Sequence, residues 1–361
     1  MTLKKTDFAK KLLKWNKSGN TRSMPWKGEK DPYKIWLSEV ILQQTRVEQG
    51  WAYYLKFLDA FPTVRHLARA PEQKVFKLWE GLGYYSRCRN LIETAKKIVS
   101  VYKGEFPATY EAIQELKGVG PYTAAAIASF AFDLPHAVVD GNVVRVLARH
   151  FGISTPIDTT PGKKLYTELA GSLLDRTQPG AYNQAIMDFG ATICKPRNPL
   201  CSACPQQKDC EAYLHGWVTQ LPVKEKTIIK KKRWLYYFIL ETPDGKTYIR
   251  QRKEKDIWED LFEFVLWETD QPVYIDDILN SDFVRGLFGK QSLTVRHISR
   301  VYLQELTHQT IQGQFISISL EKPLAALKSY LLVDKQKMSK YAFPKFINAW
   351  LLDPTPAQSL F

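Results

Sequence analysis

Two acidic residues lie inside apolar stretches of the chain, where a carboxyl group is expected to be at least partly removed from water. Glu39 lies in a helical segment that reads Ile-Trp-Leu-Ser-Glu-Val-Ile-Leu, and Asp140 follows Ala-Val-Val. Removal from water raises the pKa of a carboxyl group, which suits it to general acid catalysis. Two such groups suit glycosidic bond cleavage, in which one protonates the leaving group and the other stabilises the cationic sugar.

Each of these acids also has a structural interpretation. Glu39 could be a surface residue at a polar edge of its helix. Asp140 precedes Gly141-Asn142 at the start of an expected helix, where an aspartate commonly caps the first turn. For Asp140 the capping and the chemical roles are compatible.

Four of the five cysteines lie within 17 residues, with the spacing C-x6-C-x2-C-x5-C: Cys194, Cys201, Cys204 and Cys210. The chain begins without an export signal, so the clustering favours a metal site over disulfides. Four thiolates can hold a zinc ion or a [4Fe–4S] cluster, and the spacing alone leaves both open. The fifth cysteine, Cys88, is expected to be a reduced thiol.

A glycine-rich segment at residues 116–124 reads Leu-Lys-Gly-Val-Gly-Pro-Tyr-Thr-Ala. Gly118 and Gly120 predict a tight hairpin after one helix, and proline then opens the next helix. The hairpin amides and the new helix N-terminus would point at one place, where an anion fits. Nearby lysine and arginine residues suggest a DNA phosphate. An ordinary glycine-rich turn is the alternative.

The elements that must position these residues are helices throughout residues 1–215. Asp31-Pro32 predicts a capped helix start, and apolar periodicity extends this helix from about residue 32 to the high 50s. The other expected helices span residues 71–79, 87–102, 109–116, 122–132, 142–151, 163–174 and 183–192.

The pattern changes after residue 215. Residues 216–233 contain Pro222 and a run of four basic residues, which indicates an extended basic connector. Strands are expected at residues 234–241, 247–251 and 314–320, with a turn at Pro243-Asp244-Gly245. The sequence therefore predicts an all-α domain at 1–215 and a smaller α+β domain at 234–361.

Composition excludes several classes of protein. Hydrophobic residues make up 45% and charged residues 24% of the 361 residues, which excludes disordered and collagen-like chains. The longest nearly apolar stretch has 15 residues, at 118–132, whereas a membrane span needs roughly 20. The lysine-rich start lacks an unbroken apolar core, so no secretory signal and a cytoplasmic location are expected.

The net charge of +14 is unevenly distributed. Residues 1–215 carry +10, the connector +5 and the C-terminal domain −1. A basic domain of this kind is typical of nucleic-acid binding, although a generic basic protein has the same composition.

Taken together, the hairpin, the segment Val-Asp-Gly-Asn-Val at 139–143 and the cysteine spacing resemble the helix-hairpin-helix DNA glycosylase superfamily, which includes endonuclease III. Residues 36–45, Pro25-Trp26 and residues 81–87 (Gly-Leu-Gly-Tyr-Tyr-Ser-Arg) resemble its adenine DNA glycosylase (MutY) branch. The resemblance covers nearly all of residues 8–215. It implies two α-helical lobes with a cleft between them, and a [4Fe–4S] cluster held by the four clustered cysteines.

The resemblance also implies roles for single residues. Glu39 would protonate adenine, and Asp140 would stabilise the oxocarbenium ion or form a covalent intermediate. Tyr122 would support Asp140, and Asn142 would help to hold the acid and the attacking water. Bifunctional relatives place a lysine nucleophile at the position of Tyr122, so strand cleavage is expected to be weak or absent.

Further residues are implied to contact the DNA. The hairpin Gly118-Val119-Gly120 would bind a phosphate. Arg22, Trp26, Leu42 and Gln184 would line the adenine pocket, with simple core packing as the alternative for Trp26 and Leu42. Gln44, Thr45 and Tyr84 would fill the duplex near the opposite base, and core packing for Tyr84 and a polar helix surface for Gln44 remain alternatives.

The C-terminal part resembles the Nudix-like recognition domain of this branch. Residues 257–264 look like the branch's Trp-Glu-Phe-Pro region, with Val265 in place of the proline. The Nudix Arg-Glu-x-x-Glu-Glu cluster is missing from the sequence, so no nucleotide hydrolysis is expected. The Phe-Ser-His loop that reads 8-oxoguanine aligns with Leu306-Thr307-His308, in which threonine keeps a hydroxyl group able to hydrogen-bond.

The sequence thus predicts an all-α, two-lobed helix-hairpin-helix glycosylase domain with a [4Fe–4S] loop, followed by a smaller α+β Nudix-like domain. The expected activity is monofunctional removal of adenine opposite 8-oxoguanine or guanine in duplex DNA, by a monomer. Two alternatives remain: a thymine or uracil mismatch glycosylase, and a DNA-binding iron–sulfur protein without catalysis. The C-terminal domain argues against the first, and the two retained acids argue against the second.

Overall fold

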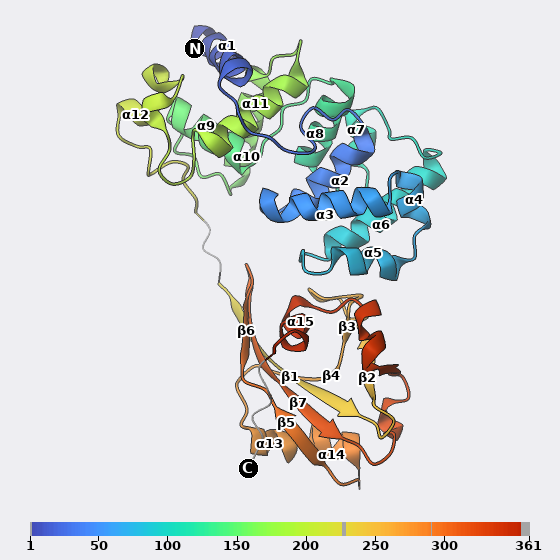
Figure 1. The fold of residues 1–361 in the computed structure, drawn as a ribbon. Helices are drawn as coiled ribbons and strands as arrows, with labels where there is room; N and C mark the ends of the chain where they lie inside the picture. Colours follow the sequence, from blue (N-terminus) through green and yellow to red (C-terminus); the bar gives the residue numbers. More distant parts are fainter. Residues whose placement is uncertain (1, 226–228, 290, 355–361) are drawn as a thin grey trace. The chain divides into compact units, whose positions relative to one another are not determined.

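The computed structural model describes residues 2–225, 229–289 and 291–354 of the chain (Figure 1). Contacts between Cα atoms divide it into two units. The first comprises Met1–Ala70 and Arg89–Lys226, and the second comprises Pro71–Cys88 and Thr227–Phe361. None of the helices in the described part of the chain has the length and apolar character to cross a membrane.

The first unit is helical, as the sequence predicts. Its helices are α1 (Thr2–Ser18), α2 (Pro32–Leu42), α3 (Val47–Ala60), α4 (Val64–Arg69), α6 (Ser86–Val101, whose first residues belong to the second unit), α7 (Tyr110–Gln114), α8 (Pro121–Phe132), α9 (Gly141–Phe151), α10 (Thr160–Leu173), α11 (Pro179–Thr192) and α12 (Glu211–Leu214). Two short 3-10 turns, Cys201–Ala203 and Gln207–Asp209, lie in the cysteine-rich loop. The sequence interpretation did not include α1, α4 or α12.

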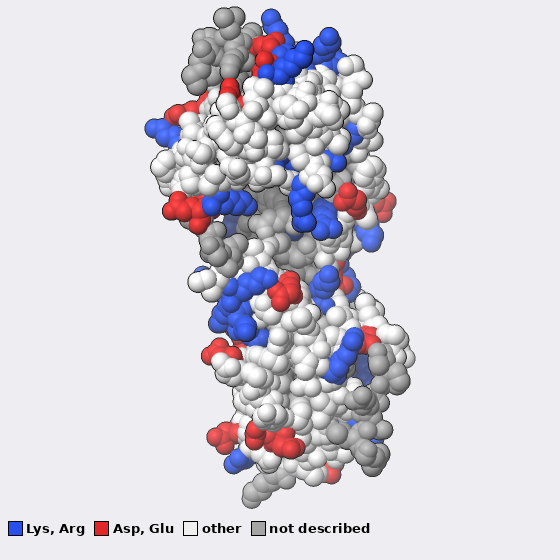
Figure 2. Space-filling model, turned by 90° about the vertical axis from the view of Figure 1, so that its left-hand side faces the viewer, with Lys and Arg blue, Asp and Glu red and all other residues white. Residues whose placement is uncertain are grey.

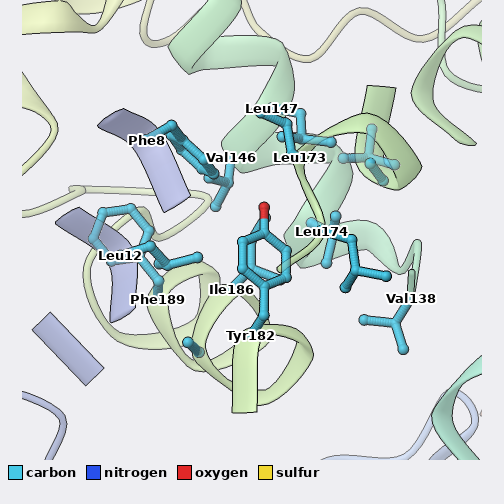
Figure 3. Packing of buried hydrophobic residues seen from close by; sticks show 14 of the residues in the cluster. Phe8, Leu12, Val138, Val146, Leu147, Leu173, Leu174, Tyr182, Ile186 and Phe189 are labelled. Atoms are coloured by element: carbon cyan, nitrogen blue, oxygen red, sulfur yellow. The ribbon is translucent and has the colours of Figure 1, made fainter. Parts of the chain in front are cut away.

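A large hydrophobic core joins α1, α9, α10 and α11. Figure 3 shows the ring of Tyr182 from α11 at its centre, among side chains that include Phe8, Leu147 and Leu173. This core holds the N-terminus of α9 against α11, which places Asp140 and Gln184 in fixed positions.

The predicted helix from residue 32 to the high 50s is wrong in one respect, because the structure divides it into α2 and α3. Gln44 adopts a left-handed backbone conformation with φ of 55°, and the Thr45 amide donates to the Leu42 carbonyl over 3.1 Å. Helix α3 then packs back on α2 so closely that a Cβ atom on Gly50 would lie 2.8 Å from a Leu42 methyl group. The apolar periodicity continues through this break, so periodicity alone could not reveal it.

The predicted hairpin between α7 and α8 is confirmed as a backbone structure. Gly118 has φ of 77°, and a Cβ atom there would lie 2.7 Å from atoms of Asn90. Gly120 is the N-cap of α8, and Pro121 is its first residue. The left-handed backbone therefore requires glycine at position 118, whereas Gly120 has φ of −85° and open space around it.

The second unit contains a mixed sheet with helices on both faces. Its strands are β1 (Lys231–Glu241), β2 (Lys246–Gln251), β3 (Phe262–Glu263), β4 (Val265–Thr269), β5 (Thr294–Ile298), β6 (Tyr302–Glu305), β7 (Gln309–Ser319) and β8 (Leu331–Asp334). The order is β3-β2-β1-β7-β5, with β4 also pairing with β1, β6 with β7 and β8 with β2. Only β1 and β7 pair in parallel among the described strands. The helices are α5 (Glu72–Trp79), α13 (Ile275–Leu279), α14 (Asp282–Phe288) and α15 (Lys345–Leu351).

Apolar side chains point alternately to the two faces of the sheet along β1, which explains why helices cover both faces. Tyr236 and Phe238 pack in a core with α13 and α14. Tyr237 points to the opposite face, where its ring lies 5.4 Å from that of Phe315 and 6.3 Å from that of Phe346 in α15. The strands predicted at 234–241, 247–251 and 314–320 are confirmed within a few residues, and the predicted mixture of helix and strand is correct.

Two features differ from the sequence boundaries. Strand β1 begins at Lys231, so the last three residues of the expected connector pair with β7; residues 226–228 lie outside the described residues. Pro71–Cys88 group with the second unit. There Lys77 Nζ donates to the Tyr341 carbonyl over 2.9 Å, and the Phe343 amide donates to Glu80 Oε1 over 2.8 Å.

Candidate active site

A cavity of about 790 Å³ lies in the first unit, between α2, the starts of α8 and α9, α11 and the segment that precedes α2. Its lining includes ten of the residues predicted for the site: Arg22, Trp26, Glu39, Leu42, Gln44, Thr45, Tyr122, Asp140, Asn142 and Gln184. The structure therefore brings together the two acids and most of the predicted base-binding residues. Tyr84, Thr307 and His308 belong to the second unit.

Glu39 is a buried acid on the wall of this cavity. Asp31 caps α2 by accepting from the Tyr33 amide, and the helix then carries Glu39 to the face that packs on α8. Only 6% of the Glu39 surface is exposed. Burial raises the pKa of Glu39 to about 7, a hydrogen bond from Tyr122 opposes the rise, and the charge of Asp140 adds to it. The surface alternative for Glu39 is wrong.

Asp140 is both a helix cap and a wall of the cavity. Its Oδ1 accepts from the Val143 amide over 2.7 Å, which caps α9, and its Oδ2 accepts from Asn142 Nδ2 over 2.7 Å. Burial raises the pKa of Asp140, whereas the hydrogen bonds from Val143 and Asn142 and the charge of Arg145 lower it. The predicted cap is confirmed.

Glu39 and Asp140 have different surroundings, and these favour the protonated form of Glu39 and the charged form of Asp140. Burial and the negative charge of Asp140 raise the pKa of Glu39, and the hydrogen bond from Tyr122 lowers it. Asp140 has several donors and a nearby guanidinium that favour its charged form. Such a pair suits a protonated acid beside a carboxylate near neutral pH.

Tyr122 lies partly buried at the start of α8 and hydrogen-bonds to Glu39. Burial raises the pKa of its phenol well above the ordinary value, and the charges of Glu39 and Asp140 add to the rise. The phenol is therefore a hydrogen-bond donor at neutral pH. Its direct partner is Glu39, whereas the sequence interpretation paired it with Asp140.

Asn142 is held in one orientation by Arg145. Arg145 Nη2 donates to Asn142 Oδ1 over 2.8 Å and to the Gly190 carbonyl over 2.8 Å, and its Nε donates to the Cys194 carbonyl over 2.8 Å. The amide nitrogen of Asn142 consequently faces Asp140. The sequence interpretation did not include Arg145.

The sequence interpretation also missed Asp188 of α11, which is fully buried. It accepts hydrogen bonds from Arg22 and Gln184, both of which line the cavity. Asp188 stands in the apolar stretch Ala-Ile-Met-Asp-Phe-Gly. That is the same signal that singled out Glu39.

The four clustered cysteines line a second, small cavity of about 30 Å³ together with Arg149. Arg149 Nη1 donates to Cys194 Sγ over 3.6 Å. The pKa of Cys204 is raised to about 12, mainly by burial; the other three thiols, as neighbouring negative charges, add to the rise, and a backbone hydrogen bond from Gln206 opposes it. Within the described ranges, no three or more His, Cys, Asp or Glu side chains are arranged to hold a single metal ion.

In the second unit, Tyr84 and Thr307 are neighbours. Their hydroxyl oxygens lie 2.6 Å apart, and Tyr84 is 42% exposed with a left-handed φ of 48°. The Arg87 guanidinium lies over the rings of Tyr84 and Trp79, 5.6 and 5.1 Å from their centroids. The structure thus joins two residues that the sequence had assigned separately to the opposite base.

Comparisons with known proteins identify the family. Residues 37–170 match the model of the HhH-GPD superfamily base excision DNA repair protein. The adenine DNA glycosylase of Buchnera aphidicola subsp. Baizongia pistaciae (strain Bp) is 37% identical over 259 residues, which cover 71% of this chain and 73% of the relative. The chain belongs to the adenine DNA glycosylase family. The relative from Buchnera aphidicola subsp. Acyrthosiphon pisum (strain APS) is 32% identical over 308 residues (82% and 86%), and that from Mus musculus is 45% identical over 230 residues (60% and 44%).

Solved structures support the helical fold of this family member. A thermostable thymine-DNA glycosylase has a TM-score of 0.55 at 32% identity, covering 59% of this chain and 97% of its own. A non-covalent endonuclease III–DNA complex has a TM-score of 0.50 at 18% identity with the same coverage. The resemblance to the superfamily, and to its adenine glycosylase branch, is confirmed.

Proposed function

We propose that this chain removes adenine from duplex DNA by hydrolysing its N-glycosidic bond. The observation that carries the proposal is the pair of unlike carboxyl groups in one cavity: Glu39, with a pKa near 7, and Asp140, held by donors. A base stacked inside a duplex cannot enter a cavity of the protein, so the nucleotide must be flipped out of the helix.

In the proposed mechanism, Glu39 protonates the adenine ring and makes the base a better leaving group. Asp140 then stabilises the oxocarbenium ion or bonds to the sugar carbon. Tyr122 orients Glu39 through their hydrogen bond, and Asn142, fixed by Arg145, orients Asp140 and the attacking water.

The proposed enzyme is monofunctional. A lyase needs an unprotonated amine to form a Schiff base, and the position after the hairpin is Tyr122. Two lysines line the cavity, but Lys27 is paired with Asp188 over 3.1 Å and Lys30 with Asp133 over 3.2 Å. Both amines are therefore held against carboxylate groups.

DNA is the proposed partner because exposed cations and a helix N-terminus are available on the first unit. Lys10, Lys14 and Lys17 are exposed at helical spacing on α1, and Figure 2 shows groups of lysine and arginine side chains on one face of the molecule. In the hairpin Gly118-Val119-Gly120 the Val119 amide donates to the Leu116 carbonyl over 3.0 Å, so we propose that a phosphate binds where the hairpin leads into the N-terminus of α8.

We propose that Cys194, Cys201, Cys204 and Cys210 hold a [4Fe–4S] cluster. The thiols surround a small cavity instead of meeting at a point. A tetrahedral zinc ion with Zn–S bonds of about 2.3 Å would draw its sulfurs to about 3.8 Å from one another. When bound, the cluster would cross-link the loop and supply a redox-active group.

Metal analysis of the purified protein checks this assignment. We expect about four iron atoms and four acid-labile sulfides per chain, because each thiolate ligates one iron of the cluster. A Cys204→Ser variant should lose iron. About one zinc ion per chain without iron would contradict the cluster.

The second unit is proposed as a Nudix-like domain that reads 8-oxoguanine opposite the adenine, with residues 1–215 as the catalytic domain and 216–233 as the connector. Thr307 and His308 lie in the turn between β6 and β7, and Tyr84 meets Thr307 there. Gln44 and Thr45, at the break between α2 and α3 in the first unit, are proposed to contact the duplex near the opposite base. The hydroxyl pair could exchange its mutual hydrogen bond for one with the oxidised base.

Single-turnover cleavage of four duplexes tests the proposed function. Adenine should be released opposite 8-oxoguanine and opposite guanine, with strand breaks mainly after alkali, and thymine or uracil opposite guanine should be retained. The thymine glycosylase is the second candidate, since a solved structure of that kind is 32% identical to this chain. Release of only thymine or uracil would establish it and refute adenine excision.

The same assay, applied to a Thr307→Val variant, tests whether the second unit recognises 8-oxoguanine. Loss of one hydrogen bond, about 1 kcal/mol, should reduce the preference for 8-oxoguanine over guanine roughly fivefold. Thr310→Val removes a nearby hydroxyl that is bonded to Glu305 and should leave the preference unchanged.

A further inference from the structure

The buried carboxylate of Asp188 gathers four donors from two segments of the chain. Its Oδ1 accepts from Arg22 Nη1 and Gln184 Nε2, each over 2.9 Å. Its Oδ2 accepts from Asn20 Nδ2 over 2.8 Å and from Lys27 Nζ over 3.1 Å. Two cations and two amides around one buried carboxylate leave it no free acceptor position.

This arrangement determines which end of the Gln184 amide faces the cavity. Asp188 can only accept hydrogen bonds, so it must face the amide nitrogen of Gln184 and would repel the oxygen. Since Gln184 lies one turn before Asp188 on α11 and also lines the cavity, its Oε1 is the group turned away from Asp188. The amide therefore offers an acceptor to a bound base.

We propose that Asp188 is a positioning residue for base specificity, which holds Gln184 so that its oxygen accepts a hydrogen bond from the exocyclic amino group of adenine. The inference rests on the proposed function, since it takes adenine as the base in the cavity. A base with a carbonyl oxygen at the same place would set two acceptors against each other, which a buried site rejects strongly.

Asp188 also positions Arg22, and this second effect must be separated from the first. The charge of Arg22 lowers the pKa of Tyr122, so a change at position 188 can alter the rate for every base. An effect on Gln184 alone should instead distinguish adenine from a purine without a substituent at position 6. The test is therefore a ratio of rates and not a single rate.

The experiment compares single-turnover release of adenine, unsubstituted purine and hypoxanthine, each opposite guanine, by the full-length protein. Asp188→Asn lets the amide at position 184 turn over, because an amide can face it with either end. We expect the adenine-to-purine ratio to fall about tenfold, with a corresponding gain in hypoxanthine relative to adenine, as one hydrogen bond to a buried acceptor is lost.

Two further variants make the result specific. In the double variant Asp188→Asn/Gln184→Glu, the carboxylate at position 184 is an acceptor in either orientation, so the adenine-to-purine ratio should return towards the wild-type value. Glu168→Gln, at an exposed ion pair on α10, should leave the ratio unchanged. If Asp188→Asn does not fold, Gln184→Met keeps the other three donors of Asp188 and should lower the ratio by a similar factor.

The outcomes separate the inference from the proposed function. Wild-type protein that does not release adenine refutes the function. If wild-type protein releases adenine but Asp188→Asn reduces adenine and purine equally, Asp188 is only structural and the inference is wrong. An unchanged ratio in Gln184→Met would also overturn it.

Discussion

Glu39→Gln should reduce the rate constant for adenine excision roughly 10³-fold, within the 10²–10⁴-fold contribution of general acid catalysis. Glutamine has nearly the same shape and can still accept from Tyr122, but it has no proton to transfer. Single-turnover release of adenine from duplex DNA measures the effect. Glu48→Gln changes an exposed carboxylate on α3 and is the matched control.

The pH dependence of the excision rate shows whether Glu39 acts as an acid or as a base. Burial raises the pKa of Glu39 to about 7, so the carboxyl group is mostly protonated below pH 7 and loses its proton above it. An acid must carry the proton it donates. The wild-type rate should therefore fall about tenfold per pH unit above about 7, and the residual rate of Glu39→Gln should be flat there. A wild-type rate that rises through pH 7 would show that Glu39 acts as a base.

Asp140→Asn should lower the excision rate about as much as Glu39→Gln does. It should leave the stability of the fold almost unchanged. Asparagine caps helices nearly as well as aspartate, so the hydrogen bond to the Val143 amide can remain. It has no negative charge with which to stabilise an oxocarbenium ion or bond to the sugar. We expect a roughly 10³-fold lower excision rate and a change in unfolding free energy below about 0.5 kcal/mol.

Asp140→Ala separates the two roles of this residue, because it removes the cap together with the charge. Urea unfolding should show a further loss of about 1 kcal/mol, with an excision rate close to that of Asp140→Asn. If Asp140→Asn excises adenine within tenfold of the wild-type rate, the residue is only a cap and the proposed mechanism fails.

The predictable features of this chain were those carried by residues adjacent in sequence. The caps of α2 and α9, the hairpin glycines and the alternation along β1 all follow from neighbours within a few positions. The chemical interest of Glu39 and Asp140 followed from apolar neighbours in the same way. The expected [4Fe–4S] cluster and the roles expected of single residues came only from the family resemblance, which paired Tyr122 with Asp140, whereas the structure pairs it with Glu39.

The features that were not predicted depend on distant partners. Asp188 is 166 residues from Arg22, and only folding shows that it holds that side chain. The break at Gln44 follows from the close approach of Gly50 to Leu42, which periodicity does not encode. Strands such as β3, with two residues, are defined by pairing and not by their own pattern.

The cap on α9 ties the carboxylate that we propose as catalytic, Asp140, to the start of a helix. Both oxygens of Asp140 are already engaged, one by a helix amide and one by Asn142, so a bond from either to the sugar must weaken one of these contacts. An ester oxygen is a poorer acceptor than a carboxylate, and a lost cap is worth about 1 kcal/mol. A covalent intermediate would therefore lose part of the α9 cap. This loss would shift the equilibrium between the covalent intermediate and the free carboxylate about fivefold towards the free carboxylate.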